Sequence, residues 1–90
     1  MSTMKDNLIA TKNALEKYGW INIKEAKPGE QGICLLIALN NAVSSQSEYL
    51  STVLYVQNLL GMSIVKWNDQ PERTAKDVFD FLQKTIDECV

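Results

Sequence analysis

The chain has 90 residues, of which 46% are hydrophobic and 22% are charged, and its formal net charge is −2. This length predicts a single domain, residues 1–90, and the composition excludes a disordered chain. The weak negative charge argues against nucleic-acid binding, which needs a strong positive field. The acidic residues alternate with lysines, so the chain does not resemble a DNA mimic either.

The sequence contains no histidine. This excludes Cys–His and Ser–His–Asp catalysis within one chain, because both need an imidazole base. Zinc sites of cysteine and histidine are excluded too, and no cofactor is expected. No signal peptide or long apolar span is visible, so we expect a cytoplasmic protein without a membrane segment. Cys34 and Cys89 are expected to be buried thiols, and whether they meet is open.

Apolar residues at helical spacing predict a first helix from about Ser2 to Tyr18. Gly19 should end this helix in a left-handed conformation. Ile9 lies off the apolar stripe and is either tucked under another segment or exposed. The stripe consists of Met4, Leu8, Thr11, Leu15 and Tyr18.

An extended piece, a turn and a second helix are predicted next along the chain. Residues 20–23 read W-I-N-I and predict a short extended piece, and K-P-G-E at 27–30 predicts a turn. Residues 32–43 then read G-I-C-L-L-I-A-L-N-N-A-V, which is apolar on every face up to the two asparagines. Such a segment predicts a buried central helix.

A third helix is predicted from Ser45, with Glu48 completing a capping box, to Leu60, where Gly61 ends it. Residues 62–67, M-S-I-V-K-W, predict a second short extended piece that could pair with the first. The last helix should begin near Thr74, which forms a capping box with Asp77. Its apolar face consists of Val78, Phe79, Leu82, Ile86 and Cys89. The predicted fold is therefore mainly α: a compact bundle of about four helices, with room for two very short extended segments.

Charge is distributed unevenly along the chain. Glu48 is the only charged residue between Glu30 and Lys66. Two consecutive helices are thus nearly charge-free, and only the first and last helices are left to cover them. Apolar surface around Leu54 and Tyr55 either forms an interface or is covered by loops and the tryptophans.

The stretch V-K-W-N-D-Q-P-E-R-T at 65–74 has two interpretations. In the structural one, Trp67 anchors the chain, Asn68 and Asp69 form a turn, and only Arg73 lacks a structural role. In the functional one, Trp67, Asp69 and Arg73 form a binding cluster, in which Asp69 orients Arg73 or Arg73 meets a phosphate or carboxylate.

The order of G-W (19–20), C-L-L-I-A-L (34–39), W-N-D (67–69) and R-T with D-V (73–74, 77–78) resembles a small bacterial and phage-associated domain family of unknown function. The likeness covers nearly the whole chain, and W-N-D followed by R-T is its most specific part. Ile37 stands where the family commonly has glycine, and the stretch after Trp20 also departs from the family pattern. The resemblance implies a helical fold and a phage or mobile-element origin, but no activity.

We expect a non-enzymatic protein-binding or regulatory module, in a specific form a phage-encoded inhibitor of a host enzyme or defence complex. A homodimer is also open. The alternative is a small-ligand protein that stacks a nucleotide base on Trp20 and Trp67 and meets its phosphate with Arg73. An enzyme is not expected, and its candidate groups would be Cys34, Tyr55, Asp69 and the lysines. The candidate binding residues are Trp20, Tyr55, Trp67, Asn68, Asp69 and Arg73.

Overall fold

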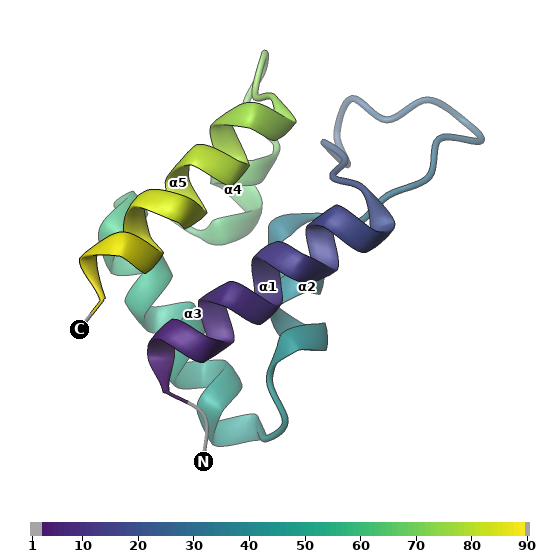
Figure 1. Ribbon diagram of the computed structural model, residues 1–90. Coiled ribbons are helices and arrows are strands. Elements are labelled where there is room, and N and C mark those ends of the chain that lie inside the picture. Colours follow the sequence, from purple (N-terminus) through teal and green to yellow (C-terminus); the bar gives the residue numbers. More distant parts are fainter. Residues whose placement is uncertain (1–2, 90) are drawn as a thin grey trace.

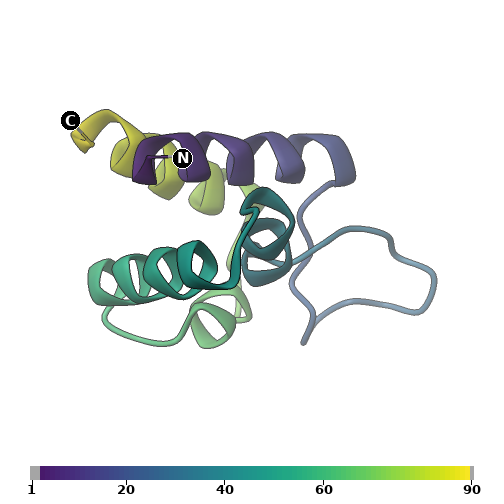
Figure 2. The same ribbon diagram turned by 90° about the horizontal axis from the view of Figure 1, so that it is seen from below.

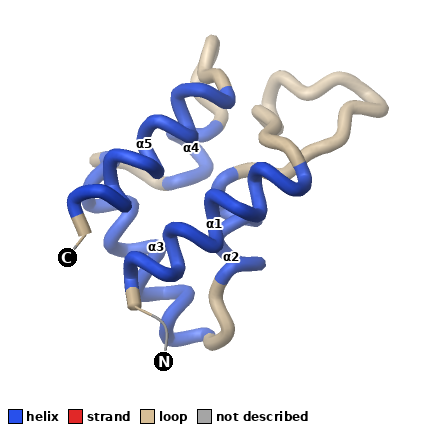
Figure 3. Tube along the Cα trace, in the orientation of Figure 1, coloured by secondary structure: helices blue, strands red, loops and turns tan. Residues whose placement is uncertain are grey.

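The computed structural model describes residues 3–89, which form five helices and no strand (Figure 1 and Figure 3). The mainly α prediction is therefore confirmed, with one helix more than expected. The helices are α1 (Met4–Tyr18), α2 (Leu35–Ala42), α3 (Gln46–Leu60), α4 (Ile64–Asn68) and α5 (Ala75–Glu88). Within these residues, no helix has both the length and the apolar character needed to cross a membrane.

The helices form two layers around one core. Helices α1 and α5 lie side by side in one layer, and α3 and α4 lie in the other, with α2 packed beneath α1 (Figure 2). The fully buried side chains between the layers include Leu8, Leu15, Leu35, Leu39, Val56, Ile64, Val78 and Leu82.

Local capping sets the ends of α1. Thr3 caps its N-terminus, accepting a hydrogen bond from the Asp6 backbone N–H while the Asp6 side chain accepts one from Thr3. The helix ends at Gly19, as predicted, but with φ 83° and ψ 146°, which is not the left-handed helical conformation. Ile9 is exposed, which decides between the two alternatives for this residue. The predicted start at Ser2 lies outside the described residues.

Helix α2 is shorter and less buried than predicted. It begins at Leu35, because Cys34 takes an extended conformation and its sulfur caps the Ile37 backbone N–H at 3.5 Å. Leu35, Ala38 and Leu39 are buried, whereas Ile37 is 45% exposed. The prediction of burial on every face was wrong, because the other helices cover only one side of α2.

Helix α3 begins and ends as predicted. Ser45 Oγ accepts the Glu48 backbone N–H at 3.2 Å, and Gly61 adopts the left-handed conformation at φ 73° and ψ 13°. Glu48 does not complete the capping box. Its Oε2 accepts hydrogen bonds from the hydroxyls of Ser44 and Ser45 instead.

Helix α4 replaces the second predicted extended segment. Ser63 caps it by accepting the Lys66 backbone N–H at 3.2 Å, and Ile64 and Asn68, four residues apart, face the core. Lys66, midway between them, is exposed, which fits a helix, because a strand would turn all three side chains to the same face. The extended assignment was wrong because five residues are too few to show a helical period in sequence.

The first extended segment pairs with a different partner from the one predicted. Trp20 forms a single parallel bridge with Ile33, and the Ile33 backbone N–H donates to Gly19 O at 2.8 Å. The loop between them projects from the bundle (Figure 1) and contains the predicted turn, closed by Glu30 N–H to Lys27 O at 3.0 Å. Gly32 has φ 151°, and a Cβ there would lie 3.0 Å from Gly19 O, so a glycine is needed where the chain crosses itself.

Candidate functional site

Asn68, the central residue of the W-N-D stretch, is completely buried and makes four hydrogen bonds. Its Oδ1 accepts from Trp20 Nε1 at 2.6 Å and from the Leu35 backbone N–H at 3.0 Å. Its Nδ2 donates to Ile21 O at 3.1 Å and to Asp69 Oδ1 at 3.0 Å. One side chain thus ties the end of α4 to the chain after α1 and to the start of α2.

The neighbouring side chains extend this network. Asp69 Oδ1 also accepts the Ile23 backbone N–H at 3.0 Å, and buried Asn22 donates to Gln70 O at 3.0 Å. We call residues 20–23 and 67–70 the asparagine clamp. Asn22 was not singled out from the sequence, because its local hydrogen bonds, to Lys24 and Glu25, are those of an ordinary turn. Its bond to Gln70, which joins the two segments, spans 48 positions and leaves no local pattern.

Trp67 and Arg73 form the second part of the W-N-D region. The Arg73 guanidinium carbon lies 4.0 Å from the centre of the Trp67 ring, and Nε donates to Trp67 O at 2.9 Å. Phe81 lies 5.3 Å from the same ring, between centroids. Arg73 therefore has a structural role, contrary to the sequence interpretation, and it is Trp67 rather than Asp69 that orients it.

Tyr55 lies on α3 and takes no part in the hydrogen bonds of the clamp. Its hydroxyl is 4.0 Å from Cys89 Sγ. This hydrogen bond raises the pKa of Tyr55 above its ordinary value, and partial burial and the nearby charges of Cys89 and Glu88 raise it further. Cys34 is buried at the start of α2 while Cys89 follows α5, and both are free thiols.

A depression of about 530 Å³ lies directly beside the clamp. Its apolar walls come from Ile23, Val65 and Pro71, and two lysines, Lys24 and Lys66, line it as well. Asp69 and Gln70 complete the lining. Of these residues the sequence prediction included only Asp69. Ile23 and Val65 offered a signal, since each is an apolar residue beside a lysine, but only the clamp brings the two segments together.

Residues 1–88 match the sequence profile of a family of unknown function. The chain belongs to this family, DUF6197. The resemblance to a small family of unknown function is confirmed to that extent, and its phage association stays a prediction. No curated protein and no solved structure matches the chain.

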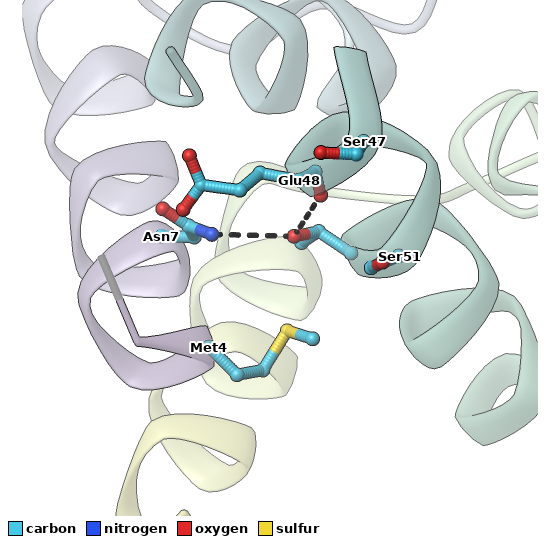
Figure 4. A pocket seen from close by; sticks show the side chains of 6 residues that line it. Met4, Asn7, Ser47, Glu48 and Ser51 are labelled. Atoms are coloured by element: carbon cyan, nitrogen blue, oxygen red, sulfur yellow. Dashed lines mark hydrogen bonds between the residues drawn. The ribbon is translucent and has the colours of Figure 1, made fainter. Parts of the chain in front are cut away.

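A smaller depression of about 170 Å³ separates the first turn of α1 from the first turn of α3. The Glu48 side chain reaches towards Asn7 across it (Figure 4), and Glu48 Oε1 is buried without a hydrogen-bond partner among the described residues. Asn7 itself donates to Thr52 Oγ1 at 3.4 Å. The volume of this depression is below the roughly 300–1,000 Å³ of usual ligand pockets. We therefore assign it no binding role.

The outer face of α3 is the other notable surface of this DUF6197 member. Leu54 is 65% exposed and Leu50 is 50% exposed. The two residues are four positions apart, so their side chains lie on one face of the helix. The remaining exposed positions of this face are uncharged: Ser47, Ser51 and Asn58. The sequence-based expectation of uncovered apolar surface around Leu54 is met at this residue, whereas Tyr55 is half-buried.

Proposed function

We propose that this protein is a non-enzymatic binding module, and that a partner protein covers the outer face of α3. The observation that carries the proposal is the exposure of Leu50 and Leu54 on a face without any charge. Charged residues are depleted at the centres of protein interfaces and enriched on free surfaces. Burial of one leucine side chain contributes about 1.5–3 kcal/mol, so two adjacent leucines supply a substantial anchor.

The contacts of the reactive side chains also support a binding role. Cys34 Sγ caps α2, Asp69 Oδ1 accepts two hydrogen bonds within the clamp, and the Tyr55 hydroxyl faces Cys89. Each of these groups therefore serves the fold. General acid–base catalysis needs a group that is free to exchange a proton with a substrate.

The alternative of a nucleotide-like ligand is less well supported. Its base would have to stack on Trp67, whose ring already carries the Arg73 guanidinium on one face and contacts Phe81. The indole N–H of Trp20 donates a hydrogen bond to Asn68, and Arg73 Nε donates one to a backbone carbonyl. A base can stack on the Trp67 face that carries Arg73 only if the guanidinium moves away from that face.

The test is affinity purification from a lysate of the native host, followed by native mass spectrometry of the eluted complexes. The double variant Leu50→Asp/Leu54→Asp is compared with Leu59→Asp, an exposed leucine of the same helix. Leu59 lies nine positions from Leu50, about 180° around the helix. We expect a stoichiometric partner with the native protein and with Leu59→Asp, and at least about tenfold less of it with the double variant.

Three results would contradict the proposal. These are the absence of any partner, equal capture by the double variant, and a homodimer that only the double variant loses. The last result would assign the α3 face to a second copy of the chain. A host enzyme or defence complex as partner would agree with the finer expectation of an inhibitor. The thermal unfolding curve of each variant must match that of the native protein for the comparison to count.

A further inference from the structure

We propose that the depression beside the asparagine clamp binds an acidic peptide segment that carries one apolar side chain. The apolar side chain enters between Ile23 and Val65, and flanking carboxylates meet Lys24 and Lys66. This inference extends the proposed function by giving the chemistry of a partner segment. It uses none of the residues of the α3 face.

The apolar walls of the depression are held in fixed positions. Ile23 is 51% exposed and Val65 is 46% exposed, although both belong to segments that are well anchored. The Ile23 backbone N–H donates a hydrogen bond to Asp69, and Val65 lies on α4 between the buried residues Ile64 and Asn68. Preorganised walls cost a ligand less ordering entropy, and about 530 Å³ is enough for a large side chain.

The charges around the depression favour an acidic occupant. Lys24 and Lys66 are exposed, and neither forms an ion pair with another residue of the described part of the chain, where lysine pairs are limited to Lys12 and Lys76. Asp69 also lines the depression, but its Oδ1 accepts hydrogen bonds from Ile23 and Asn68. The lining thus carries two positive charges and one negative charge, in a chain whose net charge is −2.

Apolar walls that are accompanied by only two cations fit a peptide better than they fit a nucleic acid. A nucleic acid binds chiefly through phosphate contacts along a continuous basic surface, which the two lysines of the depression do not provide. A peptide can bury one side chain and place carboxylates on either side of it, so that shape and charge act together.

The proposal can be tested by NMR titration of the isotope-labelled protein with synthetic peptides. The probe is Ac-Glu-Asp-Glu-Leu-Glu-Asp-Glu-NH2, and two matched peptides replace either its leucine by serine or its acidic residues by lysine. We expect shifts of the backbone amide signals of Ile23, Lys24, Val65 and Lys66 with the probe. Both matched peptides should bind at least about tenfold more weakly, and added salt should weaken binding of the probe, because the contacts are exposed.

Charge reversal provides the second arm. Lys24→Glu/Lys66→Glu should lower the affinity for the probe at least about tenfold. Lys27→Glu/Lys84→Glu changes the net charge equally at exposed positions outside the depression, and it should bind like the native protein. Equal binding of the lysine peptide, equal loss in both double variants, or shifts confined to other residues would overturn the proposal, as would no shift at millimolar peptide. The Leu50→Asp/Leu54→Asp variant should bind the probe normally, so this proposal and the α3 surface can fail separately.

Discussion

At the scale of single residues, one buried amide organises the region that the sequence marked as most distinctive. Asn68 satisfies donors and acceptors from two other segments and from its neighbour Asp69, and burial of a polar group costs free energy unless it is hydrogen-bonded. The W-N-D stretch is thus held mainly by structural contacts, and the surface beside it is where binding is proposed.

Replacement of Asn68 by alanine should destabilise the fold strongly. The change leaves the Trp20 indole N–H, the Leu35 N–H and the Ile21 carbonyl without their partner, at a cost of about 3 kcal/mol in the free energy of unfolding. Urea unfolding followed by circular dichroism measures this loss. Asn58→Ala, at an exposed position of α3, is the control and should change the free energy by less than about 0.5 kcal/mol. A loss of under about 1 kcal/mol for Asn68→Ala would contradict the clamp.

Arg73→Ala should also lower stability, although the sequence had suggested no structural role for this residue. The variant loses the contact with the Trp67 ring and the hydrogen bond from Nε to Trp67 O, together about 1 kcal/mol for a half-buried side chain. Arg73→Lys should not restore the loss, because an ammonium group is not planar. An unchanged melting temperature for Arg73→Ala would show that the stack contributes nothing.

At the scale of elements, short caps determine where the helices begin. Thr3, Ser45, Ser63 and Thr74 each accept a backbone N–H through the side-chain oxygen, and each of the first, third, fourth and fifth helices starts directly after one of them. The cap of α5 is the most complete of those predicted, because Thr74 and Asp77 bond reciprocally.

The N-terminal cap of α5 should make the free energy of unfolding depend on pH. The Thr74 backbone N–H donates to Asp77 Oδ2 at 3.0 Å, and this bond is the main cause that lowers the pKa of Asp77 below its ordinary value of 3.8. A carboxyl whose pKa is lowered by folding stabilises the native state above its unfolded pKa, and the contribution is lost as the pH falls through the folded pKa. Native protein should therefore exceed Asp77→Asn in stability at pH 6, and the difference should shrink below pH 3.8.

Urea unfolding at a series of pH values checks this expectation. Thr74→Ala, which removes the other half of the box, should lower the unfolding free energy by about 1 kcal/mol. A difference between native protein and Asp77→Asn that grows as the pH falls would contradict the assignment, because it has the opposite sign.

At the scale of the whole molecule, the described residues form two layers of helices, and α2 and α3 each keep apolar side chains exposed. A small domain has too little chain to bury all its apolar residues. Mutations in the core should therefore lower the free energy of unfolding much more than mutations in the exposed apolar surface.

Leu39 and Leu54 provide the comparison. Leu39 is completely buried, and Leu39→Ala should lower the unfolding free energy by about 2–5 kcal/mol. Leu54→Ala should change it by less than about 0.5 kcal/mol, since its side chain is mostly in water. Urea unfolding of the purified protein measures both values. A large loss for Leu54→Ala would mean that this residue is part of the core and not available to a partner.

The sequence alone determined the features that depend on neighbours along the chain. The long helices, the stops at Gly19 and Gly61, the turn at 27–30 and the caps at Ser45 and Thr74 follow from spacing and turn chemistry within a few residues. These local preferences act before any tertiary contact forms, so they can be read from one sequence.

Only the tertiary structure decided what depends on distant segments. The five residues of α4 are too few for a period, the exposure of Ile37 depends on which side of α2 its neighbours cover, and the burial of Asn68 requires Trp20 and Leu35. The depression beside the clamp arises because hydrogen bonds join residues 46 to 48 positions apart. A side-chain amide in a turn-like stretch is expected from sequence to be solvent-exposed. The neighbouring residues do not reveal the distant partners that make its burial favourable.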